Sequence, residues 1–227
     1  WWSRTNEPML KWLHPAACGA VSGRESMECA WDVQHDIERA QLNMEEITAI
    51  TADYTKFFDS FDPDFFYNFN IAIGLPKRVA ALERHMNLTM KRMVKIGGNY
   101  GKPFSGNRGA GHGNTFAVFS ALGITTVEFK CLDHQHPTVT KTSAVDDRTF
   151  RGPNADVISA VHTALAFDKC AGLENNLKKF VALSTCAKAR AHTETVKFGG
   201  AHIRVSLEDV LVGATITVRR SVRRKPV

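Results

Sequence analysis

Three aspartates have the side-chain type and the spacing that phosphoryl transfer requires. Asp53 follows a β-prone run at 47–52, and Asp146 and Asp147 stand in the expected turn between two later strands. If those strands are neighbours, three carboxylates meet, and a cation between them relieves their repulsion. Carboxylate oxygens favour Mg²⁺ or Mn²⁺, and two such ions about 4 Å apart would clamp an in-line phosphoryl transfer. The residues alone leave a second interpretation open, because an Asp pair on a turn is also typical of a solvated loop or a helix cap.

The elements around these aspartates alternate between helical and strand patterns. Apolar residues recur at helical spacing over 26–42, where one face carries Met27, Ala30, Val33, Ile37 and Ala40. Further helices are predicted at 57–69, 77–90, 115–129 and 154–171, with Gly172 as a C-terminal stop. Strands are predicted at 47–52, 139–145, 148–151, 179–183, 195–198 and 210–218, and the glycine-rich segment 91–114 predicts a β-hairpin that leads into a flexible loop. This mixture predicts an α+β fold.

The residues just ahead of the Asp pair, 140–143, are more polar than a buried strand requires. Burying the ammonium group of Lys141 without a partner would be costly. We therefore expect this strand to be partly exposed, or the sequence to be a degenerate copy.

The charge distribution indicates a partner that carries phosphate. The 227 residues have a net charge of +6 and a pI near 9.1. Cations concentrate at 91–108 and 219–225, as a phosphate backbone requires, although a solvated surface with a basic tail fits the charge equally well.

The cysteines and the apolar runs bear on the compartment. Five cysteines without a CxxC spacing, no signal-peptide pattern and no apolar run of the roughly 20 residues that a membrane helix needs predict an intracellular protein, nuclear or cytoplasmic and not secreted, without a membrane partner. The sequence lacks an initial Met, so we expect a piece of a longer polyprotein.

Six segments carry a pattern that is known from one family of polymerases. They read Ala-Asp-Tyr-Thr-Lys-Phe-Phe-Asp at 52–59, Gly-His-Gly-Asn-Thr-Phe at 111–116, Ala-Val-Asp-Asp at 144–147, Gly-Leu-Glu-Asn-Asn-Leu-Lys-Lys at 172–179, Leu-Val-Gly at 211–213 and Gly-Ala-Val-Ser-Gly-Arg at 19–24. In their order and spacing these segments resemble the motifs of reverse transcriptases, especially those of non-LTR retrotransposons and group II introns. The resemblance extends over residues 19 to 218, nearly the whole chain.

The resemblance implies a role for each matched residue. It implies that Asp53, Asp146 and Asp147 bind two Mg²⁺ (or Mn²⁺) ions, and that Lys179 is a catalytic general acid toward the leaving pyrophosphate. It also implies a nucleotide-binding group, which comprises Arg24, Tyr54, Phe58, His112 and Gly113. Phe58 would lie under the sugar of the incoming nucleotide, where a bulky ring excludes a 2′-hydroxyl and selects deoxynucleotides. Two structural interpretations stay open: Phe58 also suits an aromatic core, and Lys179 an exposed strand edge.

The resemblance further implies a domain plan and an activity. The plan is a polymerase palm, an antiparallel sheet backed by helices, with incomplete fingers and no complete thumb. Residues 1–44 would be a partial fingers segment, 45–218 the palm with a fingers insertion at about 62–112, and 219–227 the basic start of a thumb or linker. The implied activity is that of an RNA-directed DNA polymerase, a nucleotidyltransferase that adds deoxynucleoside triphosphates to the 3′-end of a DNA or RNA primer on an RNA template.

Departures from the family pattern keep two alternatives open. His112 stands where Gln is usual, and Ala144 replaces an aromatic ring. The chain is therefore alternatively a degenerate, catalytically inactive retroelement fragment that at most binds nucleic acid. An RNA-dependent RNA polymerase is the other alternative, because that class shares the palm aspartates. It needs a polar group at the position of Phe58, and Asp59 lies one residue away.

Overall fold

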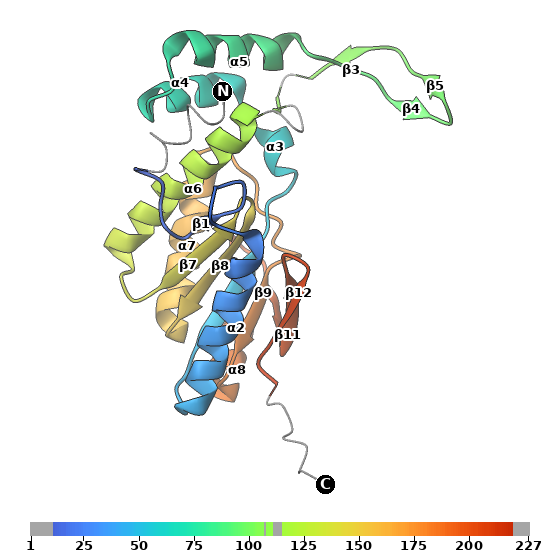
Figure 1. Cartoon of the computed structure of the whole chain (residues 1–227). Coiled ribbons are helices and arrows are strands. Elements are labelled where there is room, and N and C mark those ends of the chain that lie inside the picture. Colours follow the sequence, from blue (N-terminus) through green and yellow to red (C-terminus); the bar gives the residue numbers. More distant parts are fainter. Residues whose placement is uncertain (1–10, 107, 111–114, 220–227) are drawn as a thin grey trace.

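A six-stranded sheet forms the centre of the molecule (Figure 1). The computed structural model describes residues 11–106, 108–110 and 115–219. The sheet has the order β1 (Ala17–Cys18), β7 (Thr140–Ala144), β8 (Asp147–Gly152), β2 (Thr48–Ala52), β9 (Val181–Ser184) and β10 (Arg204–Ser206). The four inner strands run antiparallel, whereas β1 is parallel to β7 and β10 is parallel to β9. The sheet is therefore mixed, and the expectation of a wholly antiparallel sheet is wrong at its two edges.

Helices cover both faces of the sheet, because its strands are apolar on both sides. Ile50 and Phe150 pack in one core with residues of α6 (Thr115–Gln135) and α7 (Asn154–Cys170). On the other face, Ala49 and Leu183 pack against α2 (Ser26–Leu42). Neighbouring residues of β2 thus enter different cores, as the two-residue period of a strand requires. The mixed α+β class is confirmed.

Helix α2 has the bounds that the sequence predicts, with one error in its buried face. Ala30, Val33, Ile37 and Ala40 are buried, but Met27 is 38% exposed. At about 100° per residue, Met27 lies outside the stripe that the other four define. A capping box between Glu25 and Glu28 fixes the start of the helix.

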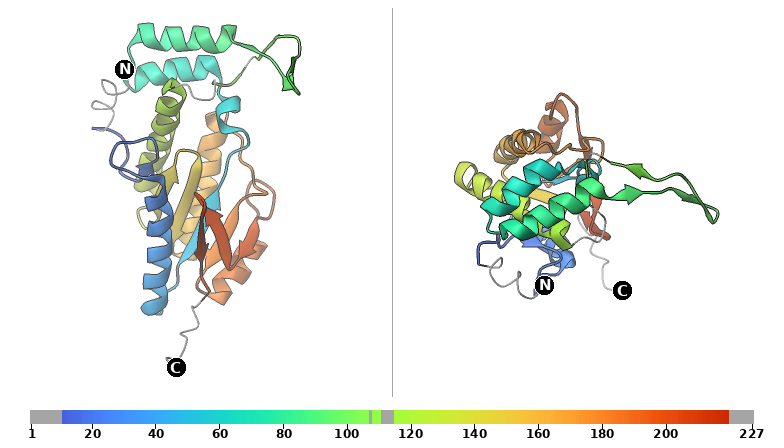
Figure 2. Two further views of the ribbon diagram at one scale, coloured as in Figure 1. Left: turned by 45° about the vertical axis from the view of Figure 1, so that its right-hand side comes forward. Right: turned by 90° about the horizontal axis from the view of Figure 1, so that it is seen from above.

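The predicted helix at 57–69 is divided into two helices, α3 (Phe57–Ser60) and α4 (Pro63–Ala72). Asp62 caps α4 by accepting hydrogen bonds from the backbone amides of Asp64 and Phe65, and Pro63 occupies the first turn, where it needs no amide partner. Helix α4 packs against α5 (Lys77–Thr89) and α6 at one end of the molecule (Figures 1 and 2). A Cβ atom on Gly123 of α6 would lie 2.7 Å from Ile73 Cδ1 and 3.0 Å from the Phe69 ring, so these side chains would have to shift to admit a larger residue.

Short paired strands confirm the hairpin that the glycine-rich segment predicts. Strands β3 (Lys91–Arg92) and β6 (Phe104–Ser105) pair, and so do β4 (Lys95–Ile96) and β5 (Asn99–Tyr100). Together they form a ribbon that projects sideways from the end of α5 (Figure 2). The predicted loop after it lies partly outside the described residues.

The C-terminal third contains the main errors of the sequence-based assignment. Residues 187–195 form a helix, α8, and the strand predicted at 195–198 is instead a connection with one isolated bridge. Strand β10 was not expected, and 210–218 forms most of a hairpin, β11 (Glu208–Leu211) and β12 (Ala214–Thr217), instead of one strand. Alanines in 187–191 favour helix, while a short Thr-Val pattern is a weak strand signal without a sheet position to occupy.

Strand β7 is buried, contrary to the expectation that its polar residues leave it partly exposed. Lys141 is only 5% exposed, yet its ammonium group is paired with the carboxylate of Asp133. It also donates to the backbone carbonyl of Val139 at 3.1 Å. Because these partners satisfy the charge, the cost that would have kept the strand at the surface is avoided. No helix among the described residues is both long and apolar enough to cross a membrane.

The packing of α2 generates a stability prediction. Ile37→Ala removes a fully buried side chain and is expected to lower the free energy of unfolding by about 2–5 kcal/mol. Trp31→Ala on the same helix is the matched control, because Trp31 is 69% exposed and its loss should cost far less. Urea denaturation of both variants measures the difference, and equal losses would contradict the packing of α2 on the sheet.

Candidate active site

The three aspartates lie at one end of the sheet because of strand register. In the β2–β8 pairing Ala52 faces Arg148, and Asp53 follows at the end of β2. Strands β7 and β8 form a hairpin in which Ala144 faces Asp147, with Val145 and Asp146 in the turn. Val145 has φ of 62°, which a β-branched residue rarely adopts. The turn therefore holds its carboxylates in a strained backbone, a feature that clusters at functional sites.

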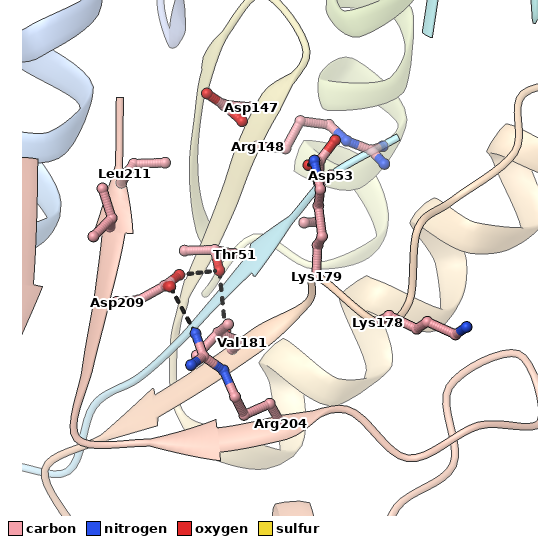
Figure 3. A pocket seen from close by; sticks show the side chains of 12 residues that line it. Thr51, Asp53, Asp147, Arg148, Lys178, Lys179, Val181, Arg204, Asp209 and Leu211 are labelled. Carbon is pink, nitrogen blue, oxygen red and sulfur yellow. Dashed lines mark hydrogen bonds and ion pairs between the residues drawn. The ribbon is translucent and has the colours of Figure 1, made fainter. Parts of the chain in front are cut away.

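A cleft of about 390 Å³ opens beside these strand ends. Asp53, Asp147 and Lys179 are among the residues that line it (Figure 3). The ammonium group of Lys179 points toward Asp53 and donates to its Oδ2 atom at 2.6 Å, whereas Lys178 points away. The cleft thus contains three of the four residues that the sequence predicts as a catalytic group, and the fourth, Asp146, precedes Asp147 in the turn between β7 and β8.

Backbone hydrogen bonds place Lys179 beside Asp53. The chain after α7 runs alongside the residues that follow β2, with a β-bridge between Tyr54 and Asn175. The amide of Asn176 donates to the carbonyl of Asp53 at 2.9 Å, and the amide of Lys179 donates to the carbonyl of Asn176 at 2.8 Å. The lysine therefore reaches the cleft from a turn that is tied to the aspartate it contacts.

The carboxylates destabilise one another. Partial burial and then the negative charges of Asp146 and Asp53 raise the pKa of Asp147 to about 6, against the opposing effect of Lys179. Burial and the charge of Asp53 also raise the pKa of Asp146. The hydrogen bond to Asp53 in turn raises the pKa of Lys179, so its ammonium group stays charged. A further cation at this strand end would relieve the remaining repulsion.

The donor chemistry at this strand end fits a divalent metal ion, while the side-chain arrangement does so only in part. Hard carboxylate oxygens are the ligands that Mg²⁺ and Mn²⁺ prefer, and the raised pKa values of Asp146 and Asp147 reflect burial and repulsion that a cation would offset. Within the ranges that the structure describes, however, no three His, Cys, Asp or Glu side chains are gathered closely enough to hold a metal ion. Asp53 is engaged by Lys179, and an ion bound to Asp53 would compete with that contact.

A buried ion cluster lies directly behind the cleft. Arg148, which follows Asp147 in the chain, is 1% exposed. Its guanidinium donates to Asp168 Oδ2 at 2.9 Å, to Glu128 Oε1 at 2.5 Å and to Asn175 Oδ1 at 2.8 Å. It also lies 4.0 Å from the centroid of the Tyr54 ring. One cation therefore connects α6, α7, β8 and the two segments that carry Asp53 and Lys179.

The two acids of the cluster differ in their hydrogen-bond partners. Asp168 accepts hydrogen bonds from Arg148, from Tyr54 at 2.9 Å and from Asn175 at 2.8 Å. Glu128 bonds only through Oε1, and its buried Oε2 has no partner. Complete burial raises the pKa of Glu128 to about 8, although Arg148 opposes this shift. Arg148 thus pairs with both acids, but only Asp168 has hydrogen-bond partners on both of its oxygens.

Another polar group lines the far part of the cleft. Asp209 of β11 accepts a hydrogen bond from the Thr51 hydroxyl at 2.7 Å and forms an ion pair with Arg204 at 3.0 Å (Figure 3). Sequence reasoning missed these residues, because they meet only through the fold. A usable signal existed for Glu128 and Asp168 alone: each is an acid that follows an apolar stretch of a helical segment, and a buried acid needs a partner.

The remaining predicted residues lie outside this cleft. Arg24 donates to the backbone carbonyls of His14 and Ala17 at 2.8 and 3.1 Å, which ties down a loop. Tyr54 is buried in the ion cluster. Phe58 is half-buried, with its ring centroid 5.2 Å from that of Phe57, and it is not among the residues that line the cleft. The last two predicted residues, His112 and Gly113, lie outside the described residues.

Comparison with solved structures identifies the fold. A telomerase structure from Candida tropicalis, truncated from its C-terminal domain, aligns with a TM-score of 0.63 and 15% identity over 95% of this chain and 42% of that chain. Telomerase from Candida albicans in complex with the TWJ fragment of telomeric RNA gives 0.64 and 12% over 94% of this chain and 36% of that chain. No protein-family model and no curated protein sequence matches the chain.

The likeness to telomerase is one of fold. The chain spans less than half the length of these telomerase structures. It has the fold of a region of telomerase, and this agrees with the reverse-transcriptase-like fold that the motifs predict. The particular retroelement class stays a prediction.

The ion cluster generates a prediction about stability. Arg148→Met leaves the Asp168 carboxylate buried without its cation and is expected to lower the free energy of unfolding by about 3–5 kcal/mol. Adding Asp168→Asn should recover part of this loss. Glu128→Gln is the comparison variant, because Gln keeps an oxygen acceptor for Arg148 and should therefore cost less than Arg148→Met. A mild effect of Arg148→Met in chemical denaturation would contradict the central role of this cation.

The carboxylate cluster generates a prediction about pH. Carbon-13 NMR should show Asp147 titrating near pH 6, and Asp146→Asn should lower that pKa by removing a neighbouring charge. Because the pKa in the folded protein exceeds the ordinary value of 3.8, ionisation of Asp147 destabilises the fold as pH rises from 3.8 to about 6. Asp147→Asn should therefore stabilise the protein at pH 8, by about 1 kcal/mol after allowance for solvent screening. A normal pKa for Asp147 would refute the crowding of these carboxylates.

Proposed function

We propose that this chain is the palm-centred core of a template-directed polymerase of the reverse-transcriptase kind. The observation that carries the proposal is the placement of Asp53, Asp147 and Lys179 on one cleft, with Asp146 in the adjoining turn, on a fold shared with a region of telomerase. A telomerase of this fold has been solved with a fragment of telomeric RNA, which supports an RNA partner for this chain as well. The substrates proposed are an RNA template, a DNA or RNA primer and deoxynucleoside triphosphates.

Each side chain at the cleft has its own proposed role in nucleotide addition. Asp53 and Asp146 would hold Mg²⁺ or Mn²⁺, which when bound supplies charge stabilisation for phosphoryl transfer. Lys179 stays protonated beside Asp53 and is exposed, so its ammonium group can bind a phosphate oxygen and donate a proton to the departing pyrophosphate. Asp147 stands beside Asp146, and its raised pKa makes the local charge sensitive to pH near neutrality.

Primer extension by the 227-residue chain tests the proposal. With an RNA template, a DNA primer, deoxynucleoside triphosphates and Mg²⁺, the protein is expected to extend the primer. Asp146→Ala should lower the rate at least about a hundredfold, because the loss of several kcal/mol of charge stabilisation corresponds to such a factor. Asp32→Ala, an exposed acid on α2, is the matched control and should leave the rate unchanged. Extension that survives Asp146→Ala would refute the site.

A non-catalytic role is the second candidate. The ion pair of Lys179 with Asp53, and the absence of a gathered three-ligand group among the described residues, favour a degenerate copy that at most binds nucleic acid. Failure of the wild-type chain to extend any primer would support this candidate. The RNA-polymerase alternative has weaker support, because the carboxylate of Asp59 lies 3.6 Å from Arg92 and does not line the cleft.

A further inference from the structure

The ribbon formed by residues 91–105, called the arm below, projects away from the rest of the molecule (Figures 1 and 2). Its strands turn at Gly97 and Gly98, next to the paired residues Ile96 and Asn99. Arg92 at its base lies 3.6 Å from Asp59 and donates to the carbonyl of Arg108, so the arm is attached firmly where it leaves the body. None of its residues lines the cleft that holds the aspartates.

The arm carries charge of one sign. It contains four cations, Lys91, Arg92, Lys95 and Lys102, and it has no Asp or Glu. The three lysines are exposed, and in the described part of the chain none of them pairs with a carboxylate. Cations that the protein itself leaves unneutralised on a projecting element favour a polyanionic partner.

Aromatic rings stand directly opposite cations on the arm. Tyr100 faces Lys95 across the ribbon, with the ammonium group 5.4 Å from the ring centroid. Phe104 faces Arg92 in the same way. The two aromatic residues are 65% and 50% exposed. Both pairs thus offer an exposed flat surface for a base, and the pair of Lys95 and Tyr100 also offers, among the described residues, an unpaired charge for a phosphate.

We propose that the arm binds single-stranded nucleic acid, with its lysines on the phosphates and Tyr100 and Phe104 stacked on bases. Single strands are bound by this combination, because every base has a face that can stack and every nucleotide has a charge. The binding surface lies outside the cleft, so the inference does not depend on catalytic activity.

The arm also exposes Met93, Val94 and Ile96, which would suit a protein partner. Protein interfaces, however, are depleted in lysine relative to the rest of the surface. A segment with three exposed lysines and no acid is a poor match for that composition, so nucleic acid is the occupant that the charge favours.

Fluorescence anisotropy tests the inference, with labelled single-stranded RNA and DNA of about 20 nucleotides, longer than the footprint of one stacking platform. The assay contains no Mg²⁺ and no nucleotide, so its outcome is separate from that of primer extension. Replacing both rings, Tyr100→Leu with Phe104→Leu, should weaken binding about tenfold or more. Lys95→Ser with Lys102→Ser should weaken it and reduce the salt slope by about 1.4, which is roughly 0.7 for each lost phosphate contact.

The matched control is Lys188→Ser with Lys197→Ser, two exposed lysines in and just after α8. It removes the same charge and should alter affinity much less than the arm variants do. Absence of binding by the wild type, or equal losses in the arm and control variants, would overturn the inference. So would sedimentation showing a dimer that Ile96→Ser dissociates while nucleic-acid binding is unchanged, because the arm would then be a site for a second copy of the chain.

Discussion

The arrangement of the cleft depends on the pairing of one buried cation, the guanidinium of Arg148. A desolvated guanidinium is tolerated only where hydrogen-bonding partners surround it, and this one is surrounded by groups from α6, α7 and the chain after α7. Tyr54, next to Asp53, stacks on it, and Arg148 itself follows Asp147. Arg148 thus holds together the segment after β2, the start of β8 and the segment after α7, which carry the polar residues of the cleft.

Beside this cluster, the protein's own side chains leave part of the carboxylate charge unneutralised. Asp146 and Asp147 carry raised pKa values, and Lys179 neutralises only Asp53 by direct contact. The buried ion cluster, hydrogen-bonded except at Arg148 Nε and Glu128 Oε2, thus lies next to a strained turn whose acids repel one another. Such an arrangement is typical of a site whose stability is completed by a bound ion or substrate.

Local signals in the sequence were sufficient for most elements and for the neighbourhood of the aspartates. Helix α2 and strand β2 follow from apolar periodicity, because each packs an apolar face on a neighbouring layer. The ion pairs could not be predicted from the sequence. The pair of Arg204 with Asp209, the partners of Arg148 and the pairing of Lys141 all depend on how the strands and helices pack. A single sequence shows that such charges exist but not which of them meet. The roles predicted for the site residues remain predictions that chemistry must test.

The most direct test of this account is a crystal structure of the chain grown with Mn²⁺, whose anomalous scattering locates the ion. The account predicts an ion held by Asp53 and Asp146, with the ammonium group of Lys179 displaced from Asp53. Carboxylates of Asp53 and Asp146 that remain more than about 8 Å apart, twice the spacing of a two-ion site, would contradict it. So would a structure in which Lys179 keeps its contact with Asp53 and no ion is bound.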